Sequence, residues 1–272
     1  MPEGHTLHRL AIDHRKDLAG GPVSVTSPQG RFAEEAARLD ERVLEDVEAY
    51  GKHLFYYFGA ASRGERGNGD LVHVHLGLFG KFWRHEPPPP PPRDTVRMRL
   101  SGVRATIDLT GATECALVDP GIRDAIIARL GPDPIRKDAD PERAWKKLQK
   151  RKSSIGAALM DQSVLAGVGN VYRAEILHVH GIHPEQPANT ITRDQWDSMW
   201  STLVTWLRQG VKDNVIITVD PKVVGKPRSR ITKGEALHVY KQDACFTCGG
   251  EIRRWDLAGR WAYACENCQP RP

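Results

Sequence analysis

The sequence lacks any long apolar run. No stretch approaches the roughly 20 consecutive apolar residues that a membrane-spanning helix needs, so we expect no contact with a membrane. The start of the chain also lacks the apolar core of a signal peptide, because His5, Arg9 and Asp13 interrupt its first turns. We therefore expect a protein of the cytoplasm. The sequence shows no internal repeat.

Cysteine is scarce in most of the sequence. Cys115 stands apart from the other four cysteines, and we expect it to be a small buried hydrophobe. The rest of the chain therefore offers no framework of disulfide bonds. The remaining cysteines lie close together near the end, which in a reducing compartment indicates a metal site rather than disulfides.

A strong excess of one charge is absent. The formal net charge is +5 and the isoelectric point is about 9.0. This balance is compatible with a polyanionic partner, yet many proteins that bind no nucleic acid share it. Any evidence for DNA binding must come from motifs.

The chain opens Met1-Pro2-Glu3-Gly4, which places an amine and a carboxylate side by side. If Met1 is removed, the secondary amine of Pro2 is free to attack a sugar C1′ or a carbonyl carbon. An α-amine titrates near pH 8, roughly two units below a lysine, so part of it is neutral at physiological pH. Pro2 is thus a candidate nucleophile and Glu3 a candidate proton carrier, although most prolines in this position serve only N-terminal processing.

The first half of the chain predicts one helix followed by short strands. Residues 5–19 have apolar residues at helical spacing and end before Gly20-Gly21-Pro22. Several short strands at close spacing indicate an antiparallel sandwich or barrel. The expected strands are Val23–Thr26, Arg42–Tyr50, His53–Phe58, Leu71–His75, Val96–Leu100 and Arg104–Leu109. Pro87–Pro92 cannot join a ladder, so we expect an exposed loop that acts as a spacer or contacts a partner.

The pattern changes to helical periodicity after about Gly131. The expected helices are Pro141–Lys150, Ser153–Gln162, Asn170–His180 and Arg193–Gly210. Residues 211–240 are basic with few large apolar residues, and we expect a mobile loop there. The fold class is therefore α+β, with a β-sandwich followed by a helical region.

Two Cys-x2-Cys pairs close the chain, Cys245 with Cys248 and Cys265 with Cys268, separated by 16 residues. This spacing matches a four-cysteine zinc site, and four thiolates leave no open position for a substrate water. We therefore predict one structural Zn²⁺. The basic and aromatic residues between the pairs suit contact with phosphates, although the hairpin could instead only pack on its neighbours.

A glycine-rich turn at Gln162–Tyr172 precedes the helix that is expected to open at Asn170. Such a turn presents backbone N–H groups at a helix N-terminus, where a phosphate can bind. By itself this turn is also an ordinary connection between helices.

Together these motifs resemble the Fpg/Nei superfamily of bifunctional DNA glycosylases. The resemblance rests on Met1–Gly4, the strand start Gly51-Lys52-His53-Leu54, the turn His75-Leu76-Gly77, the helix-two-turn-helix motif Leu165–Tyr172 and the four-cysteine finger, in the family's order. It covers nearly the whole chain. It implies a catalytic β-sandwich domain at 1–131, a helix-two-turn-helix domain at 132–234 and a zinc finger at 235–272.

The resemblance also implies roles for individual residues. Pro2 would attack C1′ of a flipped-out damaged nucleotide, Glu3 would act as general acid and proton shuttle, and Lys52 would assist protonation. β- and δ-elimination would then cut the strand. Asn170 and Arg260 match residues that contact DNA phosphates, and Leu78 falls where a side chain fills the hole left by the flipped base, although it could equally be core.

The opening Pro-Glu-Gly-His looks like the endonuclease VIII branch of actinobacterial type, which removes oxidised pyrimidines. The sheet turn Asp-Pro-Arg-Arg-Phe-Gly of the purine-preferring branch is replaced here, where Asp119-Pro120 is followed by Gly121-Ile122-Arg123. We expect a monomer that acts on damaged DNA in the bacterial cytosol and nucleoid. A purine-preferring glycosylase and a non-catalytic zinc-finger DNA-binding protein remain alternatives.

Overall fold

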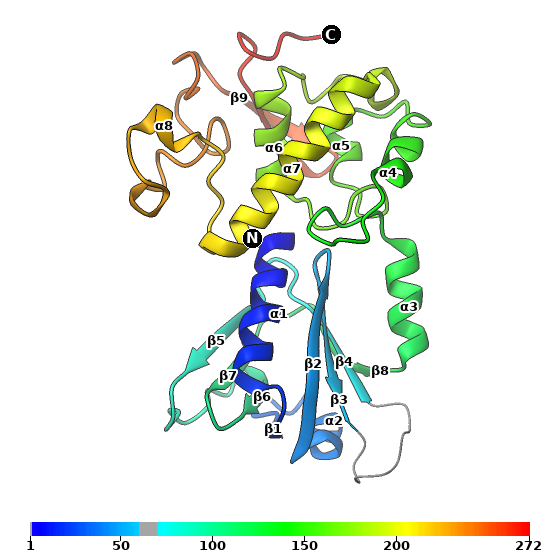
Figure 1. The fold of residues 1–272 in the computed structure, drawn as a ribbon, viewed down its shortest axis with the longest axis vertical. Helices are drawn as coiled ribbons and strands as arrows, with labels where there is room; N and C mark the ends of the chain where they lie inside the picture. Colours follow the sequence, from blue (N-terminus) through cyan, green and yellow to red (C-terminus); the bar gives the residue numbers. More distant parts are fainter. Residues whose placement is uncertain (1, 60–69) are drawn as a thin grey trace. The chain divides into compact units, whose positions relative to one another are not determined.

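The structure is a computed structural model that describes residues 2–59 and 70–272. The elements are α1 (Gly4–Leu18), β1 (Pro22–Thr26), α2 (Ala33–Leu39), β2 (Arg42–Tyr50), β3 (His53–Phe58), β4 (Asp70–His75), β5 (Lys81–His85), β6 (Val96–Ser101), β7 (Thr106–Thr110), β8 (Glu114–Val118), α3 (Pro120–Arg129), α4 (Pro141–Leu148), α5 (Ile155–Ala158), α6 (Asn170–Val179), the 3₁₀ helix η1 (Ala188–Thr190), α7 (Arg193–Asp213), α8 (Pro221–Val224), the 3₁₀ helix η2 (Arg228–Arg230), β9 (Arg253–Leu257) and β10 (Arg260–Ala264). Figure 1 shows the fold. Among the residues described, no helix combines the length and hydrophobicity needed to span a membrane.

The chain forms two compact units, one of Met1–Pro2 with Thr6–Arg129 and one of Glu3–His5 with Leu130–Pro272. The division falls inside the first motif of the chain, because Pro2 and Glu3 belong to different units. The predicted boundaries at 131 and 234, and the separate finger domain, stay predictions.

The first unit is built on an antiparallel sheet in the order β5-β7-β6-β1-β2-β3-β4-β8. Strand β1 joins its two halves, because Pro22 and Val23 pair with β2 while Ser24–Thr26 pair with β6. The core takes side chains from both halves, including Leu54 and Tyr56 on one and Leu100 and Ile107 on the other. The expected antiparallel β architecture is thus confirmed. Cys115 belongs to this core at 2% exposure, as predicted.

The second unit packs α4 to α7 around a separate apolar core. Helix α7 begins with a complete capping box at Thr192 and Gln195 and ends at Asn214 in the left-handed region. Helix α6 is buried along most of its length, and its contacts include both α7 and strand β10. It therefore organises this unit, and the backbone N–H groups at its start bond to the candidate proton carrier Glu3.

Several sequence predictions need correction. Helix α5 is shorter than the expected Ser153–Gln162, because beyond Ala158 the backbone N–H groups of Met160 and Asp161 donate to carbonyls three residues back, as in a turn. The segment 211–240, expected to be a mobile loop, contains the short helices α8 and η2. An ion pair between Arg228 and Asp213 connects η2 to the end of α7. Elements α2, α3, β5 and β8 were not predicted, because edge strands and short helices carry weak periodic signals. The proline run Pro87–Pro92 is exposed, as expected.

Candidate active site and metal site

The carboxylate of Glu3 caps the N-terminus of α6. Its oxygens accept hydrogen bonds from the backbone N–H groups of Gly169 at 2.9 Å and Val171 at 2.8 Å, with a longer contact to Tyr172 at 3.5 Å. The side chain of Glu3 is completely buried. A carboxylate at a helix N-terminus interacts favourably with the exposed amides and with the helix dipole. The candidate proton carrier is therefore held rigidly, directly after the candidate nucleophile Pro2, which is half-buried.

Glycines make this arrangement possible. A Cβ on Gly4 would lie 2.8 Å from Cα of Gly167, and a Cβ on Gly169 would lie 2.4 Å from Cδ of Glu3. The backbone N–H of Gly4 also donates to the carbonyl of Gly167 at 2.7 Å. The N-terminal segment and the glycine-rich turn thus touch backbone to backbone, which no larger residue allows.

This geometry corrects one interpretation of the glycine-rich turn. Its N–H groups were expected to be a possible phosphate site, but those of Gly169 and Val171 are bonded to Glu3. The negative charge at this helix N-terminus comes from the protein itself. The amides of Gly169 and Val171 are therefore not available to a phosphate.

Lys52 lies in the tight turn between β2 and β3, where Gly51 has a φ of 56°. Beside it on the sheet, Nδ1 of His53 lies 2.9 Å from Nε2 of His73, and the ring of His75 is 4.9 Å from that of His53. Burial lowers the pKa of His53 to about 3 and that of His73 to about 4. It also lowers the pKa of His75, which nearby Lys52 depresses further. These imidazoles are therefore neutral at physiological pH.

The turn between β4 and β5 exposes two large apolar side chains. Leu78 is 47% exposed and Phe79 is 80% exposed, so Leu78 is not a core residue. The turn is tightly constrained, since Gly77 has a φ of 65° and a Cβ there would meet the hydroxyl of Thr113 at 1.9 Å. Phe79 was missed at the sequence level, although an apolar pair between two glycines at a strand turn is a usable signal.

Asn170 and Arg173 connect α6 to the finger hairpin. Nδ2 of Asn170 donates to the carbonyl of Trp261 at 3.0 Å, and a guanidinium nitrogen of Arg173 donates to the same oxygen at 2.8 Å. Arg173 is 1% exposed, and its burial lowers its pKa to about 10. The neighbouring Arg260 has no ion pair within residues 2–59 and 70–272. The hairpin that carries Arg260 is thereby fixed next to the start of α6.

Glu175 is a second buried carboxylate on α6 that sequence reasoning missed. One oxygen accepts from the backbone N–H groups of Val239 and Tyr240, both at 2.9 Å. The other accepts from the N–H of His238 at 2.7 Å and from the hydroxyl of Thr218 at 2.5 Å. This side chain holds the segment that leads into the finger.

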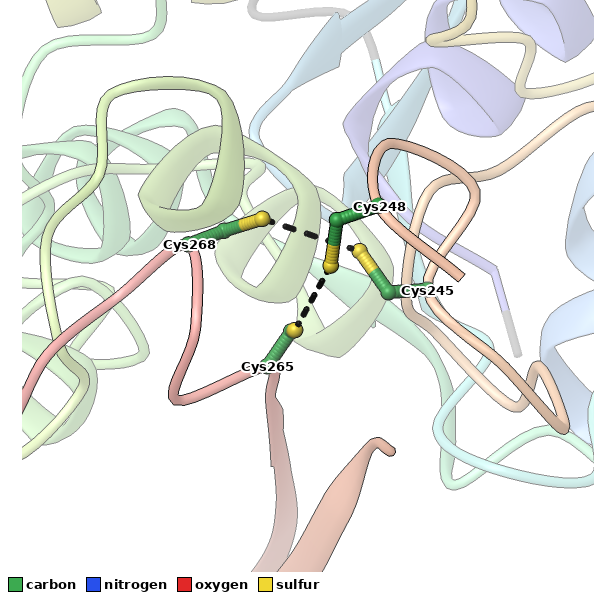
Figure 2. Close-up of side chains that lie close together, drawn as sticks. All are labelled: Cys245, Cys248, Cys265 and Cys268. Carbon is green, nitrogen blue, oxygen red and sulfur yellow. Dashed lines mark hydrogen bonds between the residues drawn. The ribbon is translucent and has the colours of Figure 1, made fainter. Parts of the chain in front are cut away.

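The four predicted cysteines come together. Figure 2 shows their sulfur atoms pointing toward one another, and the ligand atoms all lie within 4.8 Å of one another. Sγ of Cys245 lies 3.9 Å from that of Cys268, and Sγ of Cys248 lies 3.5 Å from that of Cys265. Neighbouring thiolates around a tetrahedral ion with bonds of about 2.3 Å are separated by roughly 3.8 Å. The cluster has the dimensions to bind one metal ion.

Comparison with known proteins agrees with this geometry. Residues 1–120 match the formamidopyrimidine-DNA glycosylase N-terminal domain, and residues 130–220 match the formamidopyrimidine-DNA glycosylase H2TH domain. The chain is 44% identical over 280 residues to Endonuclease 8 1 of Mycobacterium tuberculosis, covering 99% of this chain and 100% of that protein. The chain belongs to the Fpg/Nei superfamily. It is a DNA glycosylase and AP lyase of base excision repair.

Other members of the Fpg/Nei superfamily match over the same length. The formamidopyrimidine-DNA glycosylase of Thermomicrobium roseum is 30% identical, with 99% of this chain and 98% of that protein covered. A structure of MutM in complex with carbocyclic 8-oxo-G containing DNA aligns with a TM-score of 0.79 at 20% identity, covering 99% of this chain and all of the other. The Lactococcus lactis Fpg in complex with an abasic site containing DNA has a TM-score of 0.77 at the same identity and coverage. These two structures support the fold.

The segment that begins at Asp119 differs from the purine-preferring pattern, as the sequence indicated. Pro120 begins α3, and the carbonyl of Asp119 accepts a hydrogen bond from the N–H of Ile122 at 2.9 Å. This segment is therefore the start of a helix. It does not contain the Arg-Arg-Phe sequence that the purine-preferring pattern has at this position.

Proposed function

We propose that this DNA glycosylase removes oxidised pyrimidines from damaged DNA. The opening Pro-Glu-Gly-His and the loss of the purine-type turn favour this substrate class, and a relative at 44% identity is named Endonuclease 8 1. The observation that carries the mechanism is the carboxylate of Glu3, fixed on the N-terminus of α6 immediately after Pro2.

In the proposed reaction the Pro2 nitrogen attacks C1′ of the damaged nucleotide. The bond between C1′ and the base breaks, the base leaves with a proton, and the ring-opened sugar forms an iminium with Pro2. Glu3 delivers the proton to the sugar ring oxygen, and Lys52 stabilises the charge that develops nearby. Successive β- and δ-elimination expel the 3′ and then the 5′ phosphate, and hydrolysis frees Pro2.

DNA is held in this proposal by side chains and not by the amides of α6. Arg260 contacts a backbone phosphate, and it is suited to this because its charge has no ion pair in the described part of the chain. Nδ2 of Asn170 already donates to the carbonyl of Trp261, so Asn170 contacts a phosphate through the second hydrogen of that nitrogen. Leu78, together with the more exposed Phe79, enters the space that the flipped nucleotide leaves. We propose that the protein acts as a monomer in the bacterial cytosol and nucleoid.

We also propose that Cys245, Cys248, Cys265 and Cys268 bind one structural Zn²⁺. Four thiolates at these separations suit Zn²⁺, which when bound cross-links the two knuckles and has no position left for substrate. Metal analysis after dialysis should find about one equivalent of zinc, and a Cys245→Ser variant should lose it. A wild-type protein that is folded without metal would contradict this assignment.

Borohydride trapping tests the nucleophile and the substrate class together. Protein with a mass-verified N-terminal Pro2 should form a covalent adduct with duplex DNA that contains 5,6-dihydrouracil. A variant with one extra residue ahead of Pro2 should keep its fold and zinc but form no adduct. If intact Pro2 protein traps no oxidised-pyrimidine or abasic substrate, the assignment of Pro2 as the nucleophile fails.

A purine preference is the second candidate, because the Thermomicrobium roseum relative is named a formamidopyrimidine-DNA glycosylase. A duplex with 8-oxoguanine paired to cytosine separates the two. We expect faster excision of dihydrouracil, and faster excision of 8-oxoguanine would reverse the assignment.

A further inference from the structure

Trp261 is an exposed aromatic side chain near the tip of the finger hairpin. It is 52% exposed, and its position follows the two-residue turn Ala258-Gly259, in which both residues have positive φ of 55° and 73°. Such turns match the twist of the two strands and give a well-defined tip. Unpaired bases stack on exposed aromatic rings of this kind, which makes Trp261 a candidate contact residue.

Trp261 and Arg260 lie on opposite faces of this hairpin. Neighbouring residues of a strand point to opposite sides of the sheet. The register pairs Trp261 with Asp256 and Tyr263 with Arg254, so Arg254 is the diagonal neighbour of Trp261 on the same face. If Arg260 contacts a phosphate on one face of the hairpin, the opposite face, which carries Trp261, is free to contact a different part of the nucleic acid.

The position of Trp261 is fixed before any ligand binds. Its carbonyl accepts hydrogen bonds from Asn170 and from buried Arg173. The guanidinium of Arg254 lies 4.8 Å from the centre of its ring, within the range of a cation–π contact. An ordered aromatic ring loses little conformational entropy when a base stacks on it.

The same face continues into a cavity. A space of about 530 Å³ is lined by Lys241, Gln242, Asp243, Ile252, Arg254 and Tyr263. Arg254 is shared between this cavity and the stack on Trp261. Neither Arg254 nor Lys241 has an ion pair within the described residues. Their positive charges therefore face a space that is large enough for part of a nucleotide.

We propose that Trp261, Arg254 and this cavity form a track for a single DNA strand. An unpaired base stacks on Trp261, the adjoining phosphate pairs with Arg254, and the next nucleotide enters the cavity beside Lys241. The track deepens the proposed function and rests on it for the identity of the strand as DNA. It gives the enzyme affinity for unpaired nucleotides, in addition to the duplex contact of Arg260.

Binding to undamaged oligonucleotides tests the track without catalysis. Fluorescence anisotropy with a labelled oligo-dT and with a duplex of the same length should be compared for the wild type and for Trp261→Ala. Because the variant loses a stacked base, its single-strand affinity should fall about tenfold, which corresponds to about 1.4 kcal/mol. Duplex affinity should change by less than about twofold. Arg254→Ala should show the same selective loss.

Trp83 provides a matched control in the other unit. It is 43% exposed, and its ring also lies near two cations, with Nζ of Lys81 at 5.9 Å and Cζ of Arg93 at 5.7 Å from the ring centre. Trp83→Ala should leave both affinities unchanged. Arg253→Ala removes a charge from the other face of the hairpin, where Arg253 pairs with Glu266 at 2.7 Å, and should not be selective for single strands.

The outcomes separate this track from the glycosylase proposal. An unchanged single-strand affinity in Trp261→Ala, or an equal loss for single strand and duplex, would overturn the track. If Trp261→Ala loses zinc, two other variants test the track in its place. Trp261→Phe should retain the single-strand affinity, and Arg254→Ala should lose it. The binding measurements use undamaged oligonucleotides, whereas borohydride trapping by the wild type on a damaged duplex tests the glycosylase proposal, so the two proposals can fail independently.

Discussion

The two units satisfy their buried carboxylates in different ways. In the first unit the buried carboxylate of Asp108 accepts a hydrogen bond from the guanidinium of Arg99 at 2.6 Å. Both units also contain buried histidines, since burial lowers the pKa of His14 and His73 to about 4 in the first unit and lowers that of His178 in the second. The second unit buries Glu3 and Glu175 as carboxylates whose oxygens accept several backbone hydrogen bonds.

The difference has a physical cause. A buried group either gives up its charge or has the charge satisfied by hydrogen bonds. Strand side chains of the sheet have few free N–H groups nearby, because the backbone of the sheet is paired. A helix N-terminus and an irregular segment supply unpaired amides, so the buried oxygens of Glu3 and Glu175 find backbone donors there. Removal of either acceptor would leave buried N–H groups without a partner.

The largest effect is expected from Glu3→Gln. An amide in place of the carboxylate turns one acceptor toward the amides of Gly169 and Val171 into a donor, and it cannot deliver a proton. Single-turnover excision of dihydrouracil should slow by a factor of about 100 or more. Rates within about threefold of the wild type would show that Glu3 is only a helix cap. An unchanged fold by circular dichroism is the control.

Glu175→Gln should produce the largest loss of stability. The two oxygens of Glu175 together accept hydrogen bonds from four donors. In the variant one of these oxygens is replaced by an NH₂ group, which faces other donors. The cost of such a buried mismatch is about 3 kcal/mol. Urea denaturation monitored by tryptophan fluorescence measures it. Glu185→Gln is the control, since that side chain is 41% exposed, and its effect should be below about 0.5 kcal/mol.

Gly169→Ala tests the close approach at the start of α6. The new Cβ would lie 2.4 Å from Cδ of Glu3, and overpacking of this kind costs about 2 kcal/mol. Excision should slow as Glu3 is displaced. Gly234→Ala is a matched control in the same unit, because a Cβ added there would meet nothing within 4 Å among the described residues. Equal stability of the two variants would contradict the packing argument.

The smallest effect is expected from acid on the first unit. His53 and His73 have lower pKa values in the folded protein than the 6.5 of an unperturbed imidazole, so below about pH 6.5 the unfolded chain binds more protons. Stability should therefore fall as the pH drops from about 6.5 towards 4. In His73→Phe this decline should be shallower, as measured by urea denaturation at pH 7 and pH 5. An identical pH dependence in variant and wild type would exclude His73 as a cause.

Local patterns were sufficient for part of this structure. The strands Arg42–Tyr50 and His53–Phe58 and the start of α6 at Asn170 follow from alternation, turn residues and helical spacing. The cysteine cluster follows from the spacing of two knuckles within a short stretch. In each of these features the interacting residues are close in sequence, so the sequence pattern directly reflects the contacts that form the structure.

Other features depended on contacts between distant segments. The pattern of the glycine-rich turn predicts a phosphate site, and only the folded chain shows that Glu3, which is 166 residues from Gly169, occupies its amides. The burial of Glu175 and the exposure of Phe79 likewise depend on which segments pack beside them.

By itself the sequence determined the amine and carboxylate at the start of the chain, the basic finger and its four cysteines, because these are properties of neighbouring residues. Only the tertiary structure decided that the carboxylate of Glu3 caps α6 and that Asn170 holds the carbonyl of Trp261. A hydrogen bond needs its two atoms within about 3 Å, and for residues far apart in the chain only packing brings them to that distance.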